Sequence, residues 1–150
     1  ISIFCKLLVQ NKPLTVFGNG EQTRDFVYAG DIAQAAAKAV ALTGYNVINI
    51  STGKETSLNS LLEAFKSACG HELTVNYAPA RSGDIFRSVL SNKKLEALLG
   101  FVPQMDIEHG IPKTYNDYLA RRKEGLLMKN FKSPKPDYYC SFSFSNHFVG

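Results

Sequence analysis

The chain has 150 residues, about the length of one domain. Apolar residues make up 45% and charged residues 20%, which indicates a folded globular chain rather than a disordered one. No apolar run approaches the roughly 18 residues that a membrane helix needs. The three cysteines lack metal-ligand spacing and do not suit a disulfide scaffold. We therefore expect a cytoplasmic protein without a metal site or a membrane segment.

The net charge of +4 comes from one segment near the end of the chain. Residues 121–137 carry six basic and two acidic side chains, and the rest of the chain carries 11 of each sign. A nucleic-acid-binding domain usually has a basic face on its folded body. The neutral body therefore argues against nucleic acid as a partner.

The first third of the chain predicts two helices and two short strands. Apolar residues at helical spacing predict a helix over 2–11, and Leu14–Phe17 is a β-type run. Two glycines interrupt the chain before a second short strand, Arg24–Tyr28. Asp31 is expected to cap an alanine-rich helix that runs to Leu42. Because alanine permits close packing on both sides, we expect this helix to lie between two layers.

Further along, Val47–Ile50 is almost wholly apolar, as strands of a buried parallel sheet are. Helices and short extended segments are then predicted in alternation. In order, these are a helix over Leu58–Ala68 capped by Thr56 or Ser57, a strand over Leu73–Tyr77, an irregular stretch over Ala78–Phe86, an extended pair Val89–Leu90, a helix from Ser91 or Asn92 to Leu99, and a helix capped by Asp106 that runs to about Arg122.

Residues 126–150 differ in composition from the rest of the chain. They are basic, aromatic and serine-rich, and they have no helical period. We predict a disordered or non-native tail. The alternative is an extra edge strand, suggested by weak alternation at Phe142–Phe144.

A glycine-rich loop carries the first candidate for ligand binding. It joins the two early strands and places Arg24 at the start of the second. Glycine lets a backbone approach a ligand, and a planar guanidinium suits bidentate binding of phosphate. The alternative is a hairpin in which Arg24 pairs with Asp25 or Glu21, and the spacing alone does not separate the two.

A second loop combines two arginines with a carboxylate. Arg81, Asp84 and Arg87 lie in a stretch that proline and glycine keep out of helix and strand. Arg81 and Arg87 are candidates to clamp a pyrophosphate, and Asp84 to accept a hydrogen bond from a ribose hydroxyl. The alternative is a solvated loop held by an Arg–Asp pair.

Other catalytic patterns are absent from the sequence. It contains neither GxxxxGK[ST] nor HExxH, and its three histidines are far apart. The glycines at 18 and 20 precede a predicted strand rather than a helix, which excludes a dinucleotide-binding fingerprint here.

Five segments, in order, resemble the extended short-chain dehydrogenase/reductases, in the group of nucleotide-sugar epimerases and dehydratases that includes the UDP-glucose 4-epimerases. They are Lys12–Tyr28, Asp31–Ala35, Val47–Gly53, Arg81–Asp84 (the family's RxGD pattern) and Leu98–Pro103 (its LGWxP pattern). Three positions depart from the family: Asn19 replaces Asp, Ala29–Gly30 replaces Val-Asp, and Phe101 replaces Trp. None of these changes removes a phosphate-binding residue.

The resemblance covers residues 1–125 and implies a small mixed α/β substrate lobe whose Rossmann half is largely missing. The family's NAD loop, its catalytic Ser/Thr and its Tyr-x-x-x-Lys pair would precede residue 1. No tyrosine in this chain has a lysine four places later. The resemblance therefore implies no catalytic residue in this chain, and NAD held by the missing amino-terminal half. It also implies that Val47–Ile50 completes the edge of the Rossmann sheet.

The resemblance also implies a substrate site. Arg24 and Arg81 match arginines that bind the phosphates of the sugar nucleotide, and Asp84 matches an aspartate that reaches the ribose. The strand over 14–17 matches one that borders the nucleobase. The full set of predicted substrate-binding residues is Arg24, Arg81, Asp84, Leu14, Val16, Phe17 and Asn49.

The implied activity is interconversion of UDP-glucose and UDP-galactose by a hydride shuttle at C4 through NAD, with this chain inactive alone. The alternatives are an NDP-sugar 4,6-dehydratase, another NDP-sugar epimerase, or a non-catalytic nucleotide-binding or interaction module. A lobe without its Rossmann half would expose an apolar face on the helix Ala33–Leu42 and the segment after it. We therefore expect self-association into a homo-oligomer.

Overall fold

The computed structural model describes residues 1–123, so the tail predicted at 126–150 lies outside the described residues. Within 1–123 the chain forms five helices and five strands. In order they are α1 (Ser2–Val9), β1 (Leu14–Phe17), β2 (Thr23–Arg24), α2 (Ala29–Ala39), β3 (Thr56–Ser57), α3 (Leu58–Cys69), β4 (Val75–Ala78), β5 (Arg87–Ser88), α4 (Lys93–Leu99) and α5 (Ile107–Lys123). The predicted small mixed α/β unit is confirmed.

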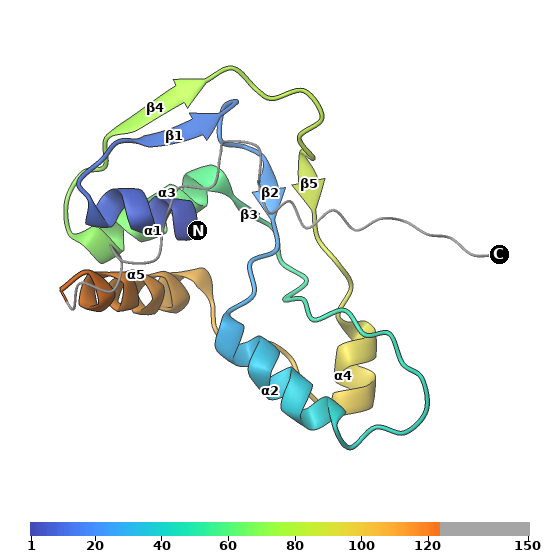
Figure 1. Ribbon diagram of the computed structural model, residues 1–150. Helices are drawn as coiled ribbons and strands as arrows, with labels where there is room; N and C mark the ends of the chain where they lie inside the picture. The colour runs from blue at the N-terminus through green and yellow to red at the C-terminus, as the bar shows by residue number, and fades with distance from the viewer. Residues whose placement is uncertain (124–150) are drawn as a thin grey trace.

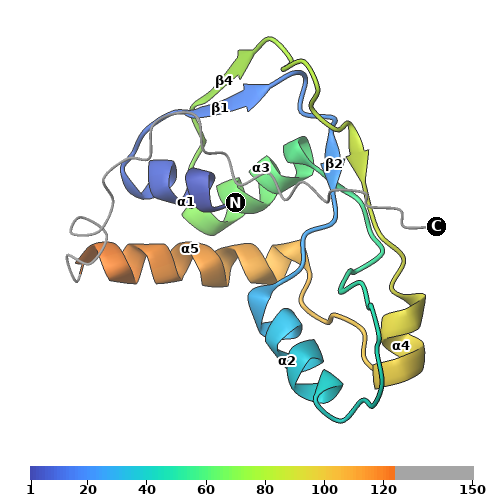
Figure 2. The ribbon, with the colours of Figure 1, turned by 45° about the vertical axis from the view of Figure 1, so that its right-hand side comes forward.

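The elements fall into a body and an arm (Figures 1 and 2). In the body, α1, α3 and α5 pack together beneath the β1–β4 pair. The arm consists of α2 and α4, which contact each other beyond β2 and β5. Each helix in residues 1–123 is too short or too polar to cross a membrane.

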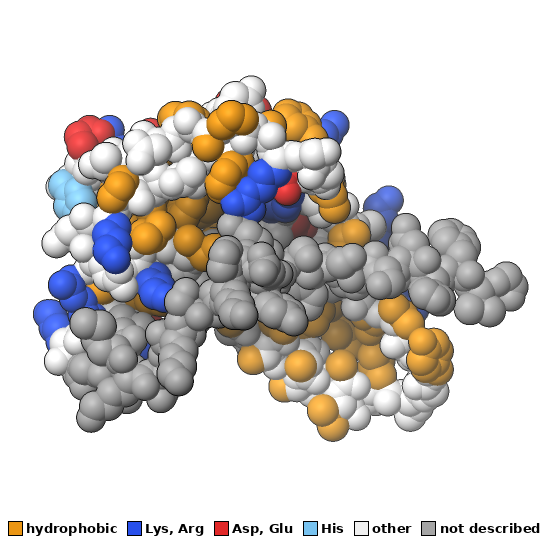
Figure 3. All heavy atoms as spheres, turned by 45° about the horizontal axis from the view of Figure 1, so that its top comes forward, with side chains coloured by type: hydrophobic (Ala, Val, Ile, Leu, Met, Phe, Trp, Pro, Cys, Tyr) orange, Lys and Arg blue, Asp and Glu red, His pale blue; other side chains and the backbone are white. Residues whose placement is uncertain are grey.

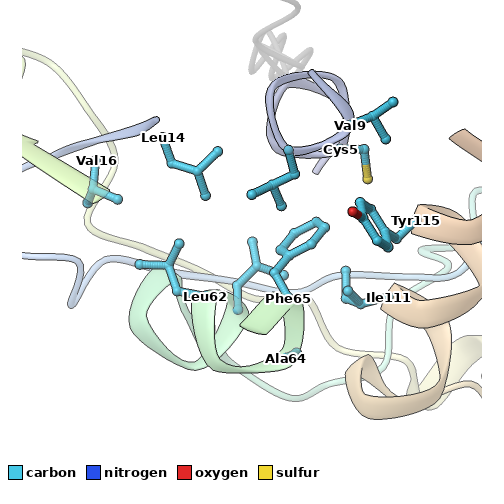
Figure 4. Packing of buried hydrophobic residues seen from close by; sticks show 11 residues of the cluster. Cys5, Val9, Leu14, Val16, Leu62, Ala64, Phe65, Ile111 and Tyr115 are labelled. Atoms are coloured by element: carbon cyan, nitrogen blue, oxygen red, sulfur yellow. The ribbon is translucent and has the colours of Figure 1, made fainter. Parts of the chain in front are cut away.

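The core of the body lies where α1, α3 and α5 meet the underside of β1 (Figure 4). Leu14 of β1 and Phe65 of α3 are fully buried there, and α5 adds Ile111 and Tyr115. The ring of Phe4 packs edge-on against Phe65, with 5.9 Å between ring centres. Burying a side chain of this size stabilises a fold by about 1.5–3 kcal/mol. The core therefore anchors β1 firmly.

Two small sheets lie above this core. β1 and β4 pair in parallel, with Phe17 opposite Ala78. In the second sheet β2 lies between β3, which is antiparallel to it, and β5, which is parallel. The second strand is shorter than the predicted Arg24–Tyr28. Just after it, the carboxylate of Asp25 accepts hydrogen bonds from the backbone N–H groups of Thr52 and Gly53.

The predicted helix boundaries are largely confirmed by capping contacts. The hydroxyl of Ser57 accepts a hydrogen bond from the backbone N–H of Ser60 at 3.0 Å, so Ser57 caps α3. Gly70 ends that helix in the left-handed region, with φ 71°. The carboxylate of Asp106 accepts from the backbone N–H of His109 at 2.9 Å and caps α5.

The predicted capping role of Asp31 is wrong. α2 begins two residues earlier, at Ala29, so Asp31 lies inside its first turn. Its carboxylate is buried and accepts hydrogen bonds from the backbone N–H groups of Gln104 and Met105, at 3.1 and 2.9 Å. Asp31 therefore stabilises the loop before α5, which runs past the start of α2, rather than its own helix.

The strand predicted at Val47–Ile50 is not formed in the described residues. Ile48 and Ile50 pack against the small cluster of Ala35, Leu95 and Phe101 in the arm, whereas Val47 is exposed. Burial alternates along the segment, but no other strand of residues 1–123 lies beside it to share a backbone ladder. Without such a neighbour the segment stays irregular.

The arm exposes an apolar face, as predicted, but α2 does not lie between two layers. One side of α2 contacts α4, and the rest of its surface is open. Hydrophobic side chains gather over this end of the molecule in Figure 3. The exposed large apolar residues of this face are Ile32, Val40, Tyr45 and Val47, of which Tyr45 is 92% exposed.

Candidate functional site

A pocket of about 490 Å³ opens between α1, β1, β2 and the loop that follows β4. One part of its lining is polar and charged, and the other is the apolar flank of α1 and α3. The lining residues are Ile1, Ile3, Phe4, Leu7, Thr15, Phe17, Gln22, Arg24, Phe26, Leu58, Leu61, Arg81 and Asp84. Four of the seven predicted site residues, Phe17, Arg24, Arg81 and Asp84, are therefore brought together.

The strand β1 contributes alternate residues to the pocket. Leu14 and Val16 point into the core and are almost completely buried, so they do not line the pocket. Thr15 and Phe17, on the opposite face of the strand, line it instead. Successive side chains of a strand point to opposite faces, so this alternation identifies Thr15 once Phe17 is assigned to the site.

Arg24 reaches the pocket from β2, the central strand of the three-stranded sheet. One terminal nitrogen of its guanidinium donates to the carbonyl of Thr23 at 2.7 Å. The two carboxylates considered as its partners are engaged elsewhere: Asp25 by Thr52 and Gly53, and Glu21 by the side-chain amide of Asn59. The hairpin alternative is therefore not what the structure adopts.

Arg81 reaches the same pocket from the loop after β4. Its guanidinium lies over the ring of Phe17, with the carbon Cζ 3.6 Å from the ring centre. The loop turns tightly, because the backbone N–H of Asp84 donates to the carbonyl of Arg81 and Gly83 has φ 85°. The turn keeps the Asp84 carboxylate beside Arg81 at the pocket.

Arg87 and Asn49 are not part of the pocket. The fork of Arg87 binds both carboxylate oxygens of Glu55, at 3.0 and 2.6 Å, so the predicted clamp of Arg81 and Arg87 is wrong. Arg87 and Thr23 lower the pKa of Glu55 to about 2 by hydrogen bonding to its charged form. Asn49 is exposed in the irregular segment beside the arm.

Sequence reasoning missed Gln22 and the apolar wall. The side-chain amide of Gln22 donates to the carbonyl of Phe17 at 2.6 Å and closes the glycine-rich loop beside the pocket. α1 faces the pocket with Ile3, Phe4 and Leu7, and the core with its other side. The helical spacing of these residues was a usable signal, but it does not reveal which apolar stripe faces a cavity.

A family model described as GDP-mannose 4,6 dehydratase matches residues 1–114. The chain belongs to the nucleotide-sugar epimerase and dehydratase family of extended short-chain dehydrogenase/reductases. The family resemblance drawn from the five sequence segments is thus confirmed.

Relatives within this family include UDP-sugar epimerases. A Methanocaldococcus jannaschii protein provisionally named UDP-glucose 4-epimerase is 42% identical over 77% of this chain and 37% of its own length. The UDP-glucose 4-epimerase of Thermotoga maritima, solved with UDP-glucose, superposes with a TM-score of 0.74 at 31% identity, over 82% of this chain and 39% of that one.

A third relative is the UDP-glucuronic acid 4-epimerase of Bacillus cereus, solved with UDP-glucuronic acid and NAD. It has a TM-score of 0.71 at 27% identity, over 79% of this chain and 38% of that one. The chain therefore spans little more than a third of the length of the relatives it matches. In fold and family it corresponds to one part of these enzymes.

Proposed function

We propose that residues 1–125 are the substrate-binding lobe of an NAD-dependent nucleotide-sugar 4-epimerase. The observation that carries the proposal is the convergence of Arg24 and Arg81 on one pocket, although they are far apart in the sequence. Two guanidinium groups on different segments suit a diphosphate, which carries charge on both of its phosphates. Relatives solved with UDP-sugars support the same assignment.

In this proposal, different parts of the pocket bind different parts of the nucleotide. Arg24 and Arg81 hold the diphosphate, and Asp84 accepts a hydrogen bond from a ribose hydroxyl. The nucleoside lies along Phe17 and the apolar flank of α1, where removal from water favours binding. The sugar then projects out of the pocket toward the part of the protein that carries the chemistry.

The lobe contributes positioning rather than bond-making. NAD, when bound to a complete enzyme, would take up and return a hydride at C4 of the sugar. The glycine turn at 18–20 runs from β1 into β2, whereas a dinucleotide-binding turn runs from a strand into a helix. This turn therefore does not fit NAD, and the two arginines act by holding the nucleotide while the sugar turns over.

The exposed face of the arm is where the Rossmann half would dock in this proposal. The face is apolar, and contiguous apolar surface on a soluble protein marks an interaction site. The segment Val47–Ile50 already has the alternation of a strand and lacks only a neighbour. Docking would supply that neighbour and cover Val47 and Tyr45.

The test is a titration of the isotope-labelled chain with UDP, followed by NMR. We expect saturable shifts of the backbone signals of Thr15, Phe17, Gln22 and Arg24, and none in α4. We also expect no turnover of UDP-glucose by the chain alone. Absence of saturable shifts around the pocket, or measurable turnover by this chain, would contradict the proposal.

We propose UDP-glucose and UDP-galactose as the substrates, with UDP-glucuronic acid as the second candidate because a relative was solved with it. The two candidates differ by a carboxylate on the sugar. Comparing the affinities of the chain for UDP, UDP-glucose and UDP-glucuronic acid separates them. A clear preference for the glucuronic acid derivative would replace the first candidate by the second.

A further inference from the structure

The distance between Arg24 and the loop that carries Arg81 and Asp84 depends on the small sheet of β3, β2 and β5. Arg24 belongs to β2, whereas Arg81 and Asp84 belong to the loop that leads into β5. β2 and β5 are two residues long and are joined by backbone bonds from Thr23 to Phe86 at 2.8 Å and from Asp25 to Ser88 at 3.0 Å. Strand pairs this short are marginally stable alone. Another contact must hold them together.

The side chain of Glu55 supplies that contact. One carboxylate oxygen accepts from the Thr23 hydroxyl at 2.7 Å and from Nε of Arg87 at 3.0 Å. The other oxygen accepts from a terminal nitrogen of Arg87 at 2.6 Å. Thr23 and Arg87 are directly opposite each other in the β2–β5 register. Glu55 itself immediately precedes β3, which pairs with the other edge of β2.

We propose that Glu55 is a positioning residue that fixes β2 against β5 and thereby sets the spacing between Arg24 and the Arg81–Asp84 loop. Its effect on binding rests on the proposed nucleotide site. The carboxylate does not line the pocket, so it acts through the strands and not by touching the ligand. A bidentate Arg–carboxylate pair fixes direction as well as distance, which suits this role.

The chain offers a matched control in the ion pair of Lys66 and Glu72. The two charged atoms are also 2.6 Å apart, but the pair joins the end of α3 to the residues that follow it. It connects no strands, and neither residue lines the pocket that contains Arg24 and Arg81. An exposed pair of this kind contributes little to stability. Glu72→Gln therefore removes a carboxylate from an ion pair without touching the three-stranded sheet.

The experiment compares Glu55→Gln with Glu72→Gln in the whole chain. Glutamine keeps the size of glutamate but replaces one acceptor oxygen by a donor, which cannot accept from Thr23 or Arg87. We expect amide hydrogen exchange at Thr23 and Asp25 to rise about fivefold in Glu55→Gln, with no change at Leu14 and Gly18 of the β1–β4 pair. Glu72→Gln should leave all four amides unchanged.

The same variants are titrated with UDP and with uridine. We expect Glu55→Gln to weaken UDP binding about fivefold and to leave uridine binding within twofold, because only the phosphates need both arginine-bearing segments. Arg87→Lys keeps the charge but loses the two-pronged guanidinium contact. It should change amide exchange and UDP affinity in the same direction as Glu55→Gln. Unchanged exchange at Thr23 and Asp25, unchanged UDP affinity, or an equal loss for uridine would each overturn the positioning role.

Failure of the nucleotide site gives a different result. If the unmodified chain binds no UDP, the proposed function fails, and the exchange measurement still decides whether Glu55 holds β2 against β5. If the unmodified chain binds UDP, and Glu55→Gln changes neither amide hydrogen exchange nor UDP affinity, the proposed function is kept and the positioning role of Glu55 is rejected.

Discussion

The guanidinium of Arg81 lies on the face of the Phe17 ring, 3.6 Å from its centre. The two residues are brought together by register, because Phe17 is opposite Ala78 at the ends of β1 and β4, and the chain reaches Arg81 three residues later. A cation over an aromatic face is attracted by the ring quadrupole. Phe17 therefore orients the arginine at the pocket before any ligand arrives.

This stacking predicts the effect of Phe17→Leu. The substitution keeps an apolar side chain but removes the aromatic face under Arg81, so we expect UDP binding to weaken about threefold to tenfold. Phe86→Leu is the matched control, because Phe86 is 59% exposed, close in sequence to Arg81 and outside the pocket. Isothermal titration calorimetry gives both affinities. Equal UDP affinity of Phe17→Leu and the unmodified chain would contradict the orienting role.

The pKa of Glu55 predicts an acid-dependent loss of stability. Hydrogen bonds from Arg87 and Thr23 lower this pKa to about 2 from an ordinary value of 4.5. Well above pH 4.5 the carboxylate is ionised in both the folded and the unfolded chain, so its stabilising contribution is complete. As the pH falls from 4.5 toward 2, the unfolded chain takes up a proton that the folded chain does not, so stability is lost.

Urea unfolding between pH 2 and pH 6 measures this loss. Glu55→Gln should show a flatter dependence of unfolding free energy on pH than the unmodified chain. Arg87→Gln, which removes the main cause of the lowered pKa, should flatten the curve in the same way. Parallel curves for all three proteins would show that Glu55 makes no such contribution.

Asp31 is predicted to be a major stabilising residue, although most side chains of its helix are exposed. Asp31→Ala leaves the backbone N–H groups of Gln104 and Met105 without their acceptor, so we expect a loss of about 1–3 kcal/mol. Asp117→Ala is the control, because Asp117 is half exposed and forms an ion pair with Arg121, and an exposed pair of this kind is worth about 0.5 kcal/mol. Chemical denaturation compares the two. Equal and small losses of unfolding free energy in the two variants would contradict the stabilising role of Asp31.

The apolar face of the arm predicts self-association. Replacing Val40, which is 86% exposed, by lysine should reduce the concentration-dependent mass measured by light scattering, while the melting temperature stays within a few degrees. Lys38→Glu on the same helix changes charge without removing apolar surface and serves as the control. A monodisperse monomer at all concentrations, unaffected by Val40→Lys, would contradict the prediction.

Local signals predicted much of the fold. Ser57, with Thr56 as its alternative, and Asp106 were predicted from capping patterns, because a cap depends only on residues within one turn of it. Asp31 fits the same pattern, yet its carboxylate bonds to residues more than seventy positions away. A sequence pattern cannot distinguish a cap from such a long-range contact.

The site was predicted in part for the same reason. Arg24, Arg81 and Asp84 were assigned by family resemblance, and the structure brings them to one pocket. Arg87 has the same charge and follows the same loop, but it lies in β5 and its guanidinium binds Glu55. Leu14 and Val16 belong to the right strand and face the core. The sequence therefore indicated which strand and loop border the pocket, whereas the direction of each side chain depends on the three-dimensional pairing of the strands.

The most direct test of a shared diphosphate site is a calorimetric titration of Arg24→Ala, Arg81→Ala and the double variant with UDP and with uridine. Each single variant should lose about 1.5–3 kcal/mol of UDP binding free energy, and uridine affinity should stay unchanged. The double variant should bind UDP no more tightly than uridine. If either arginine can be removed without weakening UDP binding, or if uridine binding falls as much as UDP binding, the two guanidinium groups do not share a diphosphate.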